Sequence, residues 1–132
     1  MSSLPLAIPG AVIYAKNLTG LRHFYAQITH CDVSQADATY AILTLAQFQL
    51  VIHAIPRHIA ESINIKTPPE RRGDTAIKLI LPVTDISQAR QTAARLGGQI
   101  DAPEREWEFQ HCRICDGHDP EGNVFQVRAT LP

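Results

Sequence analysis

Two segments of this 132-residue chain share one pattern, in which an apolar run is followed by a polar residue and a helix-like spacing of apolar residues. Asn17 in GAVIYAKNLTGLRHFYAQIT and Asp85 in KLILPVTDISQARQTAARLGG stand 68 positions apart, and each is a plausible helix N-cap. Apolar residues at helical spacing follow each cap, namely Leu18, Leu21, Tyr25 and Ile28, and then Ile86, Ala89, Ala93 and Leu96. The repeat predicts a duplicated module.

Each helix is followed by sequence that reads as strands with tight connections, ATYAILTLAQFQLVIHAI in the first half and FQHCRICDGHDPEGNVFQVRA in the second. We therefore predict a single α+β domain over residues 1–132, with one βαβββ module at 9–56 and another at 75–130. Residues 57–74 are rich in proline and charge, which indicates a linker between the modules.

The acidic stretch CDGHDPEGNVFQVRA, Cys115 to Ala129, raises the question of a metal-binding loop. It does not match the calcium loop of an EF-hand, which needs acids at alternating positions and a glutamate at the twelfth. In Asp119-Pro120-Glu121-Gly122-Asn123, the proline and glycine suit a tight turn instead. We predict a turn that leads into a last strand.

Two motifs resemble the vicinal oxygen chelate superfamily, which includes glyoxalases, bleomycin-resistance proteins and extradiol dioxygenases. LTGLRHFYAQI looks like its first helix, and DPEGNVFQV looks like its closing hairpin. The resemblance covers the chain from about Pro9 to Ala129. It implies that the two modules form a cupped mixed sheet around a cleft, and that the protein is a homodimer.

The resemblance also implies where a metal would bind, at the first and fourth strands of each module. The corresponding residues are Gly10, His53, Lys78 and Gln126. Gly10 has no side chain, and a protonated lysine has no lone pair to donate. His53 and Gln126 remain as weak candidate ligands, fewer than the three of a typical catalytic zinc site. We expect no cofactor, with one divalent metal as the alternative.

Strand alternation predicts which side chains face the cleft that the resemblance implies. The candidate ligand-binding residues are Tyr14, Gln49, His53, Lys78, Gln126 and Arg128. Two cations and no carboxylate in this set favour an anionic or oxygen-rich ligand. We hypothesise that Lys78 replaces the positive charge of the metal. The open alternative for His53, Lys78, Gln126 and Arg128 is a plain strand side chain that faces solvent or a polar neighbour.

Two functions fit this pattern. The first is a metal-independent protein, resembling the bleomycin-resistance branch, that binds an anionic or aromatic metabolite in the cleft. The alternative is a glyoxalase-like lyase or isomerase, or a dioxygenase. Such an enzyme would be metal-dependent, or it would use His53 as a catalytic base and Lys78 to stabilise a developing enolate.

Charge and hydropathy argue against nucleic acid and membranes as partners. The formal net charge is −1, and no cluster of Lys and Arg forms a nucleic-acid patch. No run approaches the ~20 apolar residues of a membrane helix. Three cysteines are an odd number, which favours free thiols and a cytoplasmic location.

Overall fold

The first half of the chain forms a four-stranded sheet covered by one helix. The computed structural model describes residues 7–132, so the first six residues of the predicted domain lie outside it. The elements of this half are β1 (Gly10–Ala15), α1 (Leu18–Thr29), β2 (Val33–Ala36), β3 (Tyr40–Leu45) and β4 (Phe48–Ala54). The strand order is β1-β4-β3-β2, and β1 runs parallel to β4.

The second half repeats this arrangement. Its elements are β5 (Leu79–Pro82), α3 (Ile86–Arg95), β6 (Gln99–Ile100), β7 (Trp107–Phe109), β8 (Cys112–His118) and β9 (Val124–Thr130). The order is β5-β9-β8-β6, and β7 also pairs with β8, so β6 and β7 are two parts of one edge. The predicted fold class is confirmed, with the strands divided between a four-stranded and a five-stranded sheet.

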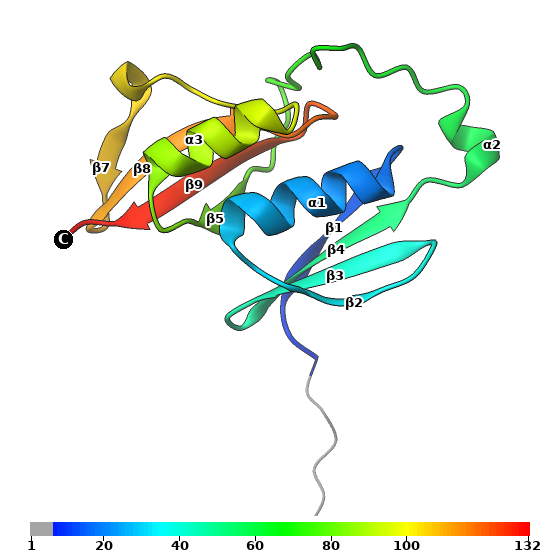
Figure 1. The fold of residues 1–132 in the computed structure, drawn as a ribbon, viewed down its shortest axis with the longest axis horizontal. Helices are drawn as coiled ribbons and strands as arrows, with labels where there is room; N and C mark the ends of the chain where they lie inside the picture. The colour runs from blue at the N-terminus through cyan, green and yellow to red at the C-terminus, as the bar shows by residue number, and fades with distance from the viewer. Residues whose placement is uncertain (1–6) are drawn as a thin grey trace, which may run out of the picture.

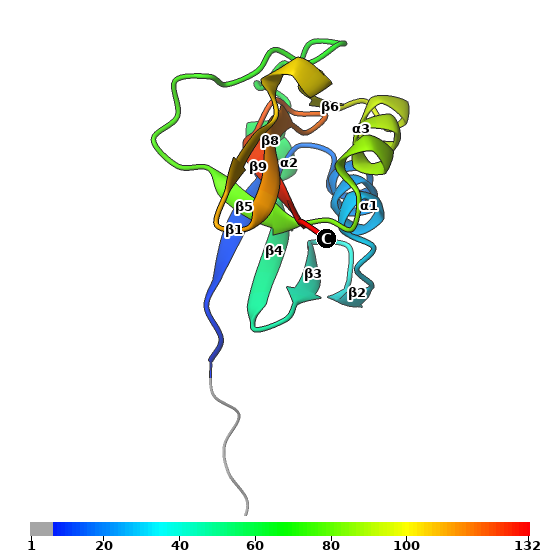
Figure 2. The ribbon, with the colours of Figure 1, turned by 90° about the vertical axis from the view of Figure 1, so that its left-hand side faces the viewer.

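Both long helices lie on the same side of the two sheets. They contact each other, and Figures 1 and 2 show them side by side. The opposite face of each sheet has no helix over it among residues 7–132. Large apolar side chains are therefore exposed there, with Val12 at 55%, Tyr14 at 64% and Ile80 at 53% of their full area.

The two predicted helix caps are confirmed. Asn17 Oδ1 accepts a hydrogen bond of 2.9 Å from the Gly20 amide. Asp85 Oδ1 accepts bonds of 2.8 and 3.3 Å from the amides of Ser87 and Gln88. These side chains satisfy amides that have no partner within the helix, which fixes where each helix begins.

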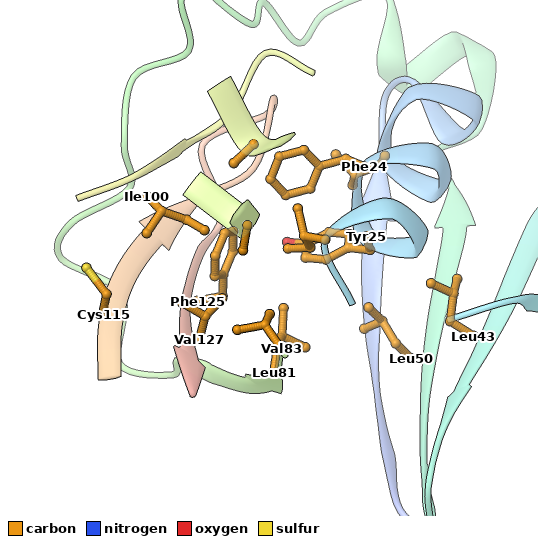
Figure 3. Close-up of a cluster of buried hydrophobic side chains, with 14 of the residues drawn as sticks. Phe24, Tyr25, Leu43, Leu50, Leu81, Val83, Ile100, Cys115, Phe125 and Val127 are labelled. Atoms are coloured by element: carbon orange, nitrogen blue, oxygen red, sulfur yellow. The ribbon is translucent and has the colours of Figure 1, made fainter. Parts of the chain in front are cut away.

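The core joins the two modules through aromatic rings. Phe24 and Tyr25 from α1 point toward Phe125 on β9 (Figure 3), and both ring centroids lie 5.9 Å from that of Phe125. Gly98, which follows α3, lets the chain pass this cluster. A Cβ atom there would lie 2.5 Å from the Phe24 ring and 2.6 Å from the His118 carbonyl oxygen.

The predicted turn at residues 119–123 is confirmed, and its acidic side chains hold the modules together. The Gly122 amide donates to the Asp119 carbonyl at 2.9 Å, with Gly122 in a left-handed conformation. The buried Asp119 carboxylate accepts a 2.6 Å bond from the Tyr25 hydroxyl. Glu121 accepts bonds of 2.9 and 2.7 Å from the amides of Lys16 and Asn17, directly before α1.

The linker runs from α2 (Arg57–Ala60) to β5 without further helix or strand. Figure 2 shows it on the side of the sheets away from α1 and α3. It is attached to the second module, because the Arg72 amide donates to the Gly122 carbonyl at 2.9 Å. None of the helices formed by residues 7–132 has the length and apolar character needed to cross a bilayer.

Candidate functional site

A row of rings crosses the exposed face of the first sheet. His53 on β4 is in register with Tyr14 on β1 and with Tyr40 on β3. The rings of Tyr14 and His53 have centroids 6.1 Å apart. Residues in register on neighbouring strands share a face, so these three side chains present one aromatic and polar surface.

The hydrogen bond of His53 fixes which nitrogen is free. Its Nδ1 lies 2.9 Å from the Ala54 carbonyl oxygen, which can only accept, so Nδ1 carries the proton. The lone pair of a neutral His53 is then on Nε2, in a side chain that is exposed. This nitrogen can accept a proton or a hydrogen bond from a ligand.

Gln49 lies on the same face but at the other end of the sheet. It is in register with Gly10, whereas His53 is in register with Tyr14. Four residues along a strand span about 13 Å, at ~3.3 Å per residue. The structure therefore does not place Gln49 beside His53.

Arg128 and Gln126 on β9 form a second polar group. Arg128 Nε donates to Gln126 Oε1 at 2.8 Å, and Arg128 Nη1 donates to Gln110 Oε1 at 2.8 Å. Its guanidinium carbon lies 6.0 Å from the centre of the Phe109 ring. No carboxylate of residues 7–132 forms an ion pair with Arg128. This cation is thus oriented by neutral groups, and no ion pair with a described residue offsets its charge.

Gln110 reaches Arg128 from an unusual turn. Gln110 and His111 connect β7 to β8, and both have positive φ angles, 51° and 59°. Residues other than Gly, Asn and Asp seldom adopt this left-handed backbone conformation. The turn places the Gln110 amide over the end of β9, where it fixes the guanidinium.

Lys78 has a partner that the sequence interpretation missed. It lies immediately before β5, and its Nζ is 3.0 Å from Asp116 Oδ2. The expectation of a face without carboxylates was wrong, because it left out β8. Asp116 is in register with Gln126 and shares its face. The Asp116 charge offsets that of Lys78, whereas Arg128 has no such partner.

The residues at the four implied metal positions do not fit a metal ion. A Cβ atom at Gly10 would lie 2.1 Å from the Gln49 carbonyl oxygen, so no side chain can be added there without moving β4. Lys78 is a cation in an ion pair, which leaves His53 and Gln126 as the remaining donors. Residues 7–132 contain no group of three His, Cys, Asp or Glu side chains placed to hold a metal.

The predicted site residues thus form two groups, one on each sheet. Tyr14 and His53 lie together on the first sheet, and Gln126 lies beside Arg128 and in register with Asp116 on the second. Within residues 7–132, no hydrogen bond, ion pair or ring contact joins the two groups. The sequence analysis did not identify Tyr40 and Asp116 as site residues, although side-chain alternation along β3 and β8 could have indicated them. No pattern in the sequence indicated Gln110.

Comparison with known proteins agrees with this architecture. Residues 10–128 match the sequence profile of the glyoxalase-like domain. No curated protein matches the chain significantly. A glyoxalase/bleomycin resistance protein/dioxygenase family enzyme from Burkholderia phytofirmans PsJN is 16% identical, with a TM-score of 0.64 over 92% of this chain and 97% of that one.

Two further solved structures share the fold at lower identity. A hypothetical protein from S. aureus is 12% identical, with a TM-score of 0.62 over 96% of this chain and 95% of that one. The fosfomycin resistance protein FosX from Mesorhizobium loti is 8% identical, with a TM-score of 0.62 over 98% and 95%. Since the profile match covers nearly the whole chain and the repeated modules have the same topology, the chain belongs to the glyoxalase-like domain family of the vicinal oxygen chelate superfamily.

Proposed function

We propose that the protein binds a small anionic or aromatic metabolite without a metal, as a member of the bleomycin-resistance branch of its superfamily. The observation that carries the proposal is the environment of Arg128. Its guanidinium is held by two amide oxygens and lies near an aromatic ring, and it forms no ion pair with any acid among residues 7–132. Such an arginine is suited to a carboxylate or phosphate.

The surroundings of Arg128 favour a ligand with an apolar part. Pro82 is the register neighbour of Arg128 on β5, and Ile80 precedes it on the same face with more than half of its side chain exposed. An aromatic acid would cover this apolar surface while its carboxylate meets Arg128.

A test uses benzoate as the probe and tag-free, metal-stripped protein in buffer with EDTA. We expect saturable changes in the NMR spectrum at residues around Arg128. Arg128→Gln should weaken benzoate binding about ten-fold, because a charge-assisted hydrogen bond is lost. The matched control is Arg95→Gln on the outer side of α3, which changes the net charge equally and should leave the affinity unchanged. Equal affinities in the two variants, or no binding at all, would contradict the proposal.

We further propose that the exposed apolar face is completed by a second copy of the chain, so that the protein acts as a homodimer. The exposed Val12 side chain and the open edges of β1 and β5 support this proposal. Sedimentation or light scattering should give the mass of a dimer at micromolar concentration, and a monomer would refute it. Three free thiols support a cytoplasmic location.

The second candidate is a metal-free enzyme, favoured by the free Nε2 of His53. A base at His53 would need an oxyanion stabiliser close to the same substrate atom. Lys78 is paired with Asp116 and belongs to the other sheet, which supports binding over catalysis. An oxo-acid whose turnover has a bell-shaped pH dependence, abolished in His53→Ala, would reverse this ranking.

A further inference from the structure

A buried hydrogen bond attaches the linker to the second sheet. Arg71 Nε, in the linker, donates to Nδ1 of His118 at the end of β8, over 2.7 Å. His118 is 7% exposed, and the Arg71 side chain is 29% exposed. A guanidinium can only donate, so Nδ1 accepts, and the imidazole is neutral with its proton on Nε2.

This bond is the one hydrogen bond that the Arg71 side chain donates within residues 7–132. Arg71 Nη2 also lies 2.8 Å from Oδ1 of Asp101, just after β6, but without the geometry of a hydrogen bond. Asp101 is shared with Arg105, whose Nε lies 3.9 Å from Oδ2. The ion pair with Asp101 is therefore a poor substitute for the bond to His118.

His118 faces few other charges. Arg71 is the cation beside its ring, and Asp101 is the nearby acid. A proton added to His118 therefore acts chiefly on the contact with Arg71. The remaining neighbours along β8 and on the adjoining strands are uncharged or already paired: Gln99 on β6, Val124 on β9, Asp116 with Lys78, and Asp119 with Tyr25.

Protonation of His118 breaks the bond and brings two cations together. In the imidazolium, Nδ1 carries a proton and can no longer accept from Arg71. Burial, and then the Arg71 charge, lower the pKa of His118 from its ordinary value of 6.5, while Asp101 opposes them. The attached linker thus disfavours the proton, whereas release of the linker returns the pKa toward 6.5. Release is therefore favoured as the pH falls below about 6.5.

The linker covers part of the open face of the second sheet, and Figure 2 shows it on this side. A cavity of about 320 Å³ lies between them, with Arg71 in one wall and Asp116 and Val124 of the sheet in the other. Asp116 is in register with Gln126, the partner of Arg128. Release of Arg71 therefore uncovers the sheet next to the candidate ligand site.

We propose that the contact between Arg71 and His118 is a pH-sensitive attachment, which holds the linker on the second sheet at neutral pH and releases it below about pH 6.5. Neutral His118 accepts from Arg71, and protonated His118 repels it. The neighbouring backbone bond, from the Arg72 amide to the Gly122 carbonyl at 2.9 Å, is lost with the release. This device does not depend on which ligand the protein binds, so it is independent of the function proposed above.

Limited proteolysis of the full chain with proteinase K measures the release, because cleavage follows the population of the open form. The reference is His118→Asn, which keeps an acceptor oxygen near the position of Nδ1 but does not titrate. Dividing the two rates at each pH cancels the pH dependence of the protease itself. From pH 7.5 to pH 5.5, cleavage of the wild-type protein within residues 61–78 should rise by up to about ten-fold relative to His118→Asn.

Arg71→Ala gives a second readout that does not depend on how His118→Asn folds. An NMR titration of its His118 ring should show a pKa closer to 6.5 than in the wild-type protein, because the neighbouring charge is gone. Cleavage of its linker should vary with pH only as that of His118→Asn does. The matched control is Arg72→Ala, which removes an equal charge from a residue without an ion pair within residues 7–132 and should keep the wild-type response.

Three results would overturn the proposal. The first is a cleavage ratio between the wild-type protein and His118→Asn that stays constant with pH. The second is acid-induced cleavage that occurs throughout the chain at one rate, which indicates global unfolding instead of release of the linker. The third is an unchanged pKa of His118 in Arg71→Ala.

Discussion

We expect the contact between Glu121 and the start of α1 to contribute measurably to the free energy of unfolding, because it joins the two modules. The Glu121 side chain is 6% exposed and accepts hydrogen bonds from two backbone amides of the other module. Glu121→Gln keeps the shape of the side chain but replaces one acceptor oxygen with an NH₂ group. One of the two amides, Lys16 or Asn17, then faces a donor.

The expected cost follows from the loss of one charge-assisted hydrogen bond. Such bonds contribute about 1.5–3 kcal/mol, and the negative charge near a helix N-terminus adds about 0.3–1 kcal/mol. We therefore expect Glu121→Gln to lower the free energy of unfolding by about 2–3 kcal/mol. For a chain of this size, each kcal/mol lowers the melting temperature by about 3–5 °C.

Urea denaturation followed by circular dichroism measures this difference. The matched control is Glu61→Gln, since Glu61 is 70% exposed and pairs with Arg57 at 3.5 Å on α2. An exposed ion pair contributes little, so the control should stay within about 0.5 kcal/mol of the wild-type protein. If Glu121→Gln is as stable as Glu61→Gln, the bonds from Glu121 to the Lys16 and Asn17 amides do not stabilise the fold.

Three further changes test other parts of the structure. Tyr25→Phe removes the hydroxyl that donates to the buried Asp119 carboxylate and should cost about 2 kcal/mol in chemical denaturation; a loss below about 0.5 kcal/mol would contradict this role. Gly122→Ala places a side chain at a φ of 87° and against the Glu70 carbonyl, so it should release the linker, and limited proteolysis should cut residues 61–78 faster than in the wild-type protein. Burial and then the Arg71 charge lower the pKa of His118 below its ordinary value of 6.5. The unfolded chain therefore binds the proton first, and stability is lost as the pH falls below 6.5. The advantage of the wild-type protein over His118→Gln should shrink between about pH 8 and about pH 5, and a constant difference would argue against this titration.

Local features of the fold were predictable from the sequence because their signals lie within a few residues. Asn17 and Asp85 cap helices through amides two or three residues away. The turn at residues 119–123 likewise depends on its own proline and glycine. What the acids of this turn bind was not predictable, since Glu121 reaches an amide 105 positions away in the sequence.

The candidate site was predictable in part for the same reason. Alternation along β1, β4 and β9 put Tyr14, His53, Gln126 and Arg128 on the exposed face, as the structure has them. The ion pair of Lys78 with an acid 38 positions away depends on how the strands pair, and this pairing is not visible in local periodicity. The two separate groups on the two sheets follow from the same long-range arrangement.

We propose that this member of the superfamily binds its ligand without a metal. Calorimetric titration of tag-free, metal-stripped protein with zinc, nickel, manganese and iron(II) tests it most directly, since Gly10 and Lys78 occupy two of the implied ligand positions. We expect no tight stoichiometric site for any of the four ions. One tight site per chain that is lost in His53→Ala would contradict it and would favour a metal-dependent enzyme.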